Sequence, residues 1–91
     1  MERQAMETRI GIVGIVVESP DCAGRINDIL HDYAELIVGR MGIPYRERGV
    51  SVITLIVDGS NDEISALTGR LGRVVGASVK SMVTKENRAE L

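Results

Sequence analysis

Two segments that are apolar on both of their alternating faces constrain the fold of this chain most. They are residues 9–18 (RIGIVGIVVE) and 50–58 (VSVITLIVD), and both are short and rich in Ile and Val. A strand with one face in water alternates apolar and polar residues, and neither segment does so. We therefore predict that both segments are central strands of one sheet.

A helix is predicted after each of these strands. Ser19 suits an N-cap, Pro20 suits the first helical position, and Asp21 suits the positive end of a helix. Ser60 or Asn61 can cap the second helix. The apolar residues of the two helices repeat at an offset of 38 positions, since Ile26, Ile29 and Tyr33 precede Ile64, Leu67 and Leu71.

Two further strands complete the chain. We predict them at residues 36–41 and 77–83, with a long polar turn at 42–49. The order strand, helix, strand, strand, helix, strand is typical of the ferredoxin-like α+β fold. We therefore expect a βαββαβ sandwich with a four-stranded antiparallel sheet and two helices on one face.

The chain has 91 residues, of which 44% are hydrophobic, and this fits one small domain. We expect that domain at residues 8–83, with a disordered N-terminal tail at 1–7 and a C-terminal tail at 84–91. Thirteen acidic and eleven basic residues, and central strands without aromatic residues, argue against direct nucleic-acid binding. Without an apolar run of membrane-spanning length or a signal-peptide core, we expect a cytoplasmic protein that does not bind membranes.

The sheet face opposite the helices is also predicted to be apolar. If Val13, Ile15 and Val17 meet the helices, then Ile10, Ile12 and Val16 lie on the other face. Soluble monomers rarely expose such a patch. We therefore expect a homo-oligomer, a dimer or tetramer, that forms through the open sheet face.

No pattern of an enzyme is present, neither a Ser-His-Asp arrangement nor a glycine-rich phosphate loop. The single histidine, His31, and the single cysteine, Cys22, are weak candidates for metal ligands. A metal site needs three or four ligands, so these two would have to act across subunits. The alternatives are a structural or solvated histidine and a cysteine that is simply a small residue.

The densest cluster of functional side chains holds Arg40, Tyr45, Arg46 and Arg48. Such a set can bind a carboxylate or the acidic face of a partner. The alternative is a solvated hairpin in which Glu47 pairs locally.

Much of the chain resembles a family of small proteins described as iron-only hydrogenase system regulators. The resemblance covers about residues 8–83 and is most specific in residues 40–46 (RMGIPYR) and 61–69 (NDEISALTG). It implies an ACT-like ferredoxin-fold domain. It also implies a family whose genes are associated with hydrogenase maturation genes. It also implies similarity to the effector domain of the nickel-responsive repressor, a tetramer held together through ACT-like sheets.

The resemblance implies a non-enzymatic, oligomeric regulatory module that binds a small-molecule effector or a protein partner at subunit interfaces. The predicted ligand-binding residues are Ser19, Pro20 and Asp21 in the first loop and Arg40, Tyr45, Arg46 and Arg48 in the turn. The alternatives are a metal-binding or metal-sensing protein that uses His31 and Cys22 across subunits, and an assembly adaptor without a ligand. No cofactor is indicated, and we expect no DNA-reading segment before residue 8.

Overall fold

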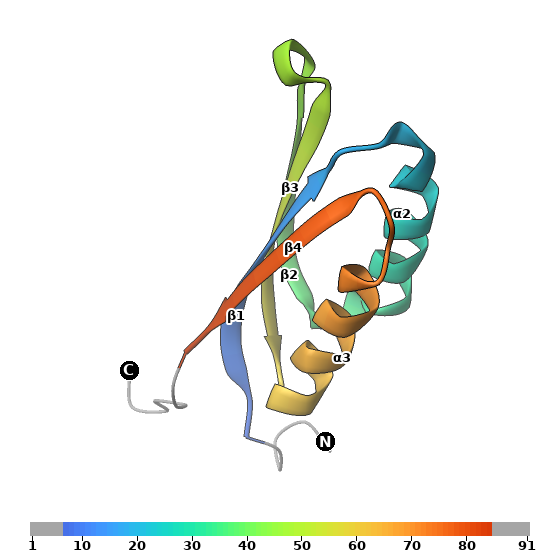
Figure 1. Ribbon diagram of the computed structural model, residues 1–91. Coiled ribbons are helices and arrows are strands. Elements are labelled where there is room, and N and C mark those ends of the chain that lie inside the picture. Colours follow the sequence, from blue (N-terminus) through green and yellow to red (C-terminus); the bar gives the residue numbers. More distant parts are fainter. Residues whose placement is uncertain (1–6, 85–91) are drawn as a thin grey trace.

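The computed structural model describes residues 7–84, and these form two helices packed on one face of a four-stranded sheet (Figure 1). The elements are β1 (Arg9–Val17), η1 (Pro20–Cys22), α2 (Ala23–Asp32), η2 (Ala34–Leu36), β2 (Ile37–Tyr45), η3 (Arg46–Arg48), β3 (Val50–Gly59), α3 (Asn61–Gly72) and β4 (Ala77–Val83), where η denotes a single 3-10 turn. The sheet is antiparallel in the order β2-β3-β1-β4. The predicted ferredoxin-like fold, with β1 and β3 as central strands, is confirmed.

The predicted tails, residues 1–7 and 84–91, lie outside the described residues except for Glu7 and Thr84. The Thr84 amide donates a hydrogen bond to the Ile10 carbonyl at 3.0 Å, so this residue still borders the sheet. Within residues 7–84, no helix is long and apolar enough to cross a membrane.

Both predicted helix starts have side-chain caps. The Ser19 hydroxyl accepts a hydrogen bond from the Asp21 amide, and Pro20 occupies the first helical position. The Ser60 hydroxyl accepts from the Glu63 amide at 3.1 Å, while the Glu63 carboxylate accepts from the Ser60 amide at 2.8 Å. This reciprocal capping box satisfies two backbone donors and fixes the start of α3.

The long turn predicted at 42–49 is wrong, because β2 continues to Tyr45 and only residues 46–49 form the turn. Ile43 pairs with Val52, and Tyr45 pairs with Val50, so cross-strand contacts outweigh the turn signal of Gly42 and Pro44. Gly49 closes the hairpin with a φ of 69°, a left-handed conformation that favours glycine.

The core lies between the helices and the facing side of the sheet. Val13, Leu55, Val57, Leu67 and Leu71 are completely buried there. They alternate along β1 and β3 with the residues of the opposite face. The predicted alternation of two apolar sets is therefore confirmed, and the set that meets the helices is the odd-numbered one on both central strands.

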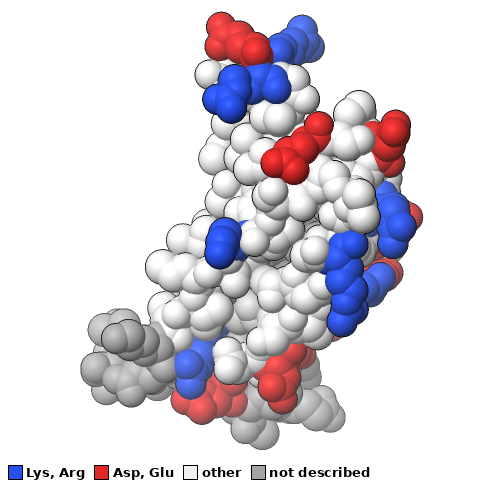
Figure 2. All heavy atoms as spheres, viewed as in Figure 1, with Lys and Arg blue, Asp and Glu red and all other residues white. Residues whose placement is uncertain are grey.

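The opposite side of the sheet, the open face, has no element packed on it within residues 7–84. Its exposed apolar side chains come from all four strands: Ile10, Ile12, Met41, Ile43, Tyr45, Ile56 and Met82. Asp58 and Lys80 are the charged residues at paired positions of this face. Figure 2 shows charged side chains at the hairpin tip, along the helices and at the opposite end of the molecule, whereas the visible surface on the side away from the helices is largely uncharged.

Candidate functional site

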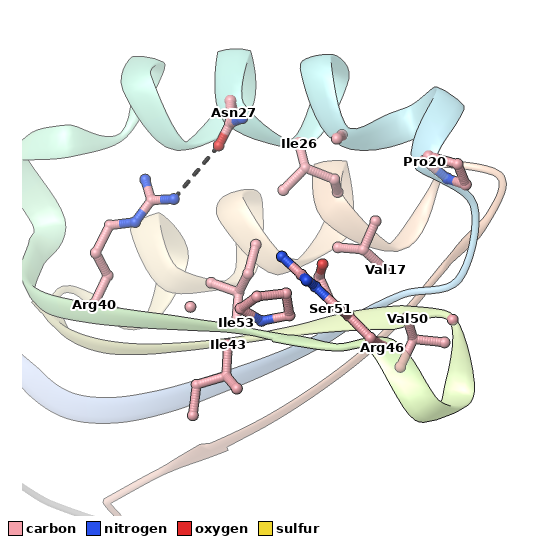
Figure 3. Close-up of a pocket in the computed structure, with 14 residues that line it drawn as sticks. Val17, Pro20, Ile26, Asn27, Arg40, Ile43, Arg46, Val50, Ser51 and Ile53 are labelled. Atoms are coloured by element: carbon pink, nitrogen blue, oxygen red, sulfur yellow. Dashed lines mark hydrogen bonds between the residues drawn. The ribbon is translucent and has the colours of Figure 1, made fainter.

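The main candidate site is a cavity of about 640 Å³ between the β2–β3 hairpin and α2, which we call the hairpin groove (Figure 3). Its floor is apolar, with Val17, Ile26 and Ile53 at the margin of the core. These three side chains are buried, so they form a fixed surface.

The groove exists because the hairpin carries small residues where the body of the sheet carries large ones. On the side of β2 and β3 that faces the helices, the residues near the turn are Gly42, Pro44 and Ser51. At the corresponding positions further along β3, the large residues Leu55 and Val57 are completely buried under the helices. The space that the smaller residues leave unfilled near the turn is the cavity.

Two arginines reach into the groove from its two ends (Figure 3). Arg40 projects from β2 toward α2, where its Nη2 donates a hydrogen bond to the Asn27 Oδ1 at 3.4 Å. Arg46 projects from η3, and its side chain turns back between the hairpin and α2. No acidic residue lines the groove, and within residues 7–84 neither arginine takes part in an ion pair. Two positive charges beside an apolar floor suit an organic anion.

The groove gathers three of the seven ligand-binding residues predicted from the sequence: Pro20, Arg40 and Arg46. The other four lie outside it. Ser19 and Asp21 belong to the cap of η1, Tyr45 lies on the open face, and Arg48 is at the hairpin tip.

Sequence reasoning missed Asn27 and Ser51, and it missed the role of Ile26 and Ile53 as the floor. Asn27 comes from α2 and Ser51 from β3, so their meeting is a long-range consequence of the fold. The sequence signal for the groove was the alternation of the small residues Gly42 and Pro44 with the larger Met41 and Ile43.

The two weak metal-ligand candidates lie apart within one subunit. Cys22 is buried, and its Sγ donates a hydrogen bond to the Ser19 carbonyl at 3.2 Å. His31 is exposed near the other end of α2, and nine residues of helix correspond to roughly 13 Å. Among residues 7–84, no group of three or more His, Cys, Asp and Glu side chains is placed to hold a metal ion.

A second cluster of charges joins the two helices. Arg70 on α3 pairs with Asp32 on α2 at 3.2 Å, and its guanidinium lies 5.5 Å from the centre of the Tyr33 ring. The contact with Tyr33 and the one with Asp32 raise the pKa of the Arg70 guanidinium above its ordinary value. Arg70 is therefore paired with a carboxylate of its own chain, whereas within residues 7–84 the arginines of the groove are not.

The βαββαβ order, the sheet order and the placement of both helices on one face define a small ferredoxin-like α+β domain. The chain belongs to the TM1266-like family, whose description is "Iron-only hydrogenase system regulator, putative" and whose model matches residues 9–81.

The chain is similar to the uncharacterized protein TM1266 from Thermotoga maritima. The two are 38% identical, with a TM-score of 0.82 over 87% of this chain and 100% of that one.

Two more distant structures share the fold. A formyltetrahydrofolate deformylase from Pseudomonas putida KT2440 is 13% identical, with a TM-score of 0.58 over 80% of this chain and 28% of that one. The de novo designed protein Foldit4 is 12% identical, with a TM-score of 0.55 over 89% of this chain and 100% of that one. No curated protein matches the chain.

Proposed function

We propose that this chain is a non-enzymatic, homo-oligomeric, ACT-like regulatory module of an iron-only hydrogenase system in the cytoplasm. It acts by binding a small effector or a protein partner in the hairpin groove. Membership of the TM1266-like family supports the link to the hydrogenase system. The groove and the open face support the mode of action.

The observation that carries the proposal is that one hairpin builds both surfaces. Along β2, Arg40, Gly42 and Pro44 line the groove, while Met41 and Tyr45 lie on the open face. Ile43 borders the groove, but its side chain points to the open face (Figure 3). An occupant that shifts the hairpin would therefore change the surface offered to a second copy. Two linked binding events of this kind are the requirement for an allosteric regulator.

A second copy of the chain is the proposed occupant of the open face. The exposed fractions of Ile12, Ile43 and Ile56 are 44%, 52% and 47%, so a monomer would leave large apolar side chains in water. Each of the four strands contributes exposed apolar side chains to this face, and a two-fold axis would bring two such surfaces together.

Light scattering of the purified protein after size-exclusion chromatography tests this proposal. We expect a dimer or tetramer of the 9.9 kDa chain at micromolar concentration. Ile56→Asp, in the middle of the open face opposite Ile12, should give a monomer. Val75→Asp is the matched control, because Val75 is 91% exposed and lies outside the sheet. A monomeric wild type, or an oligomer that survives Ile56→Asp, would contradict the interface.

Metal content measured on the same chromatographic peak separates the proposal from the metal-binding alternative. We expect no stoichiometric metal. A metal that co-elutes at one per subunit and is lost in His31→Ala would favour the alternative, in which His31 and Cys22 act across subunits.

A further inference from the structure

We propose that the hairpin groove binds an elongated aliphatic dicarboxylate, with one carboxylate on Arg40, the other on Arg46, and the carbon chain between them. This inference rests on the proposed function, because it names the class of ligand for the site described there.

The first argument is the placement of charge. Arg40 and Arg46 are six residues apart on an extended hairpin, a backbone distance of roughly 20 Å. Both side chains turn into the space between the hairpin and α2, from opposite ends of the groove (Figure 3). Since the lining includes no acidic residue, each guanidinium can bind a carboxylate of the ligand.

The second argument is the surface between the two charges. Ile53, whose exposed fraction is 9%, and the completely buried Ile26 lie there (Figure 3), and the exposed Pro44 is a further apolar residue of the lining. A methylene chain laid on this floor loses contact with water without moving the core. The cavity volume of about 640 Å³ lies within the range of small-molecule sites.

The third argument excludes a peptide that adds a strand beside β2. β2 is an edge strand, but its register shifts between Ile37 and Gly39, and Pro44 has no amide proton to donate. Both features interrupt the ladder that an added strand needs. A small organic anion needs no such ladder.

Titration of the 15N-labelled protein by NMR tests the proposal with three probes that share an eight-carbon chain. Suberate has two carboxylates, octanoate has one and 1-octanol has none. We expect the Kd to rise about tenfold from suberate to octanoate and again to octanol, as each charge-assisted contact is lost. The shifted amides should lie in residues 40–46 and beside Ile26. Equal affinity for the three probes, or shifts confined to the open face, would overturn the proposal.

Three variants test whether Arg40 and Arg46 each bind one carboxylate of suberate. Arg40→Gln and Arg46→Gln should each weaken suberate binding about tenfold, so that the variant binds suberate as the wild type binds octanoate. Arg48→Gln is the matched control, because Arg48 belongs to the same turn but does not line the groove. An equal loss in Arg48→Gln would show nonspecific attraction to the hairpin tip and would also overturn the proposal.

The outcomes separate this inference from the proposed function. If the protein is an oligomer but does not bind suberate, the dicarboxylate proposal is wrong, and the regulatory module has a different effector. If the protein is a monomer but binds suberate with the expected dependence on Arg40 and Arg46, the proposed ligand class stands and the oligomeric mechanism is wrong.

Discussion

The two ends of the β2–β3 pair are built differently. Where the helices cover the sheet, Leu55 and Val57 are completely buried. Near the turn, every residue from 40 to 49 is exposed, and the hairpin extends past the helices (Figure 1). One continuous pair of strands therefore supplies the core at one end and two surfaces at the other.

The difference lies in side-chain size on the side that faces the helices. Large aliphatic residues there pack against α2 and α3, whereas Gly42, Pro44 and Ser51 leave a cavity. Packing stabilises the first region, and the hairpin can accommodate an occupant because little of its own surface is buried. Changes in the body should therefore cost stability, and changes in the hairpin should chiefly affect binding.

The largest expected effect is that of Leu67→Ala in the body. Leu67 is completely buried, so the truncation should lower the free energy of unfolding by about 2–5 kcal/mol through lost burial and a residual cavity. Ile43→Ala in the hairpin should cost less than about 1 kcal/mol, because Ile43 is already half exposed. Urea unfolding of both variants in the monomeric Ile56→Asp background compares them without the open-face interface, which would otherwise cover Ile43. Equal losses would show that the hairpin is as firmly packed as the body.

Two glycines with positive φ give the second comparison. Gly76 has a φ of 97°, and an added Cβ would lie 2.9 Å from the Ser19 Cβ, so Gly76→Ala combines strain with a clash. We expect a loss of roughly 2–3 kcal/mol. Gly49 in the hairpin has a φ of 69° and open space around it, so Gly49→Ala should cost only about 1 kcal/mol of strain. Thermal unfolding checks the order, and a costlier Gly49→Ala would contradict it.

Most of the fold could be predicted because local signals and the global pattern agree. Two strands apolar on both faces must be central, and Ser60 begins a helix whose apolar spacing repeats that of the first. The extent of β2 could not be predicted, since Gly42 and Pro44 are turn residues. Only the pairing of β2 with β3 extends the strand through them.

The candidate site could be predicted only in part, because the faces of β2 depend on a bulge. Ile37 pairs with Val57, but after the register shift Gly39 pairs with Ile56. This extra residue at Val38 reverses which positions face the helices. Charge clustering therefore indicated the right segment, while the assignment of Arg40 to the helix side and of Tyr45 to the open face needed the register.

The helix caps give the third and smaller comparison. Ser60→Ala removes one half of the capping box of α3 and should cost about 1 kcal/mol. Ser19→Ala should cost less, because the Ser19 hydroxyl accepts one bond of 3.3 Å at an exposed single turn beside the groove. Urea unfolding of both variants tests this order. A larger loss in Ser19→Ala would mean that the first loop, and not α3, anchors the body.

The smallest expected effect is that of Asn27→Ala, which removes the hydrogen bond across the hairpin groove. The bond is long at 3.4 Å and exposed, so after its loss water can solvate the Arg40 guanidinium. We expect a change in the free energy of unfolding below about 0.5 kcal/mol, and unchanged hydrogen exchange of the hairpin amides. A loss as large as that of Ser60→Ala would mean that this bridge holds the hairpin to α2. The groove would then belong to the stabilising body, and the division between a packed region and a binding region would fail.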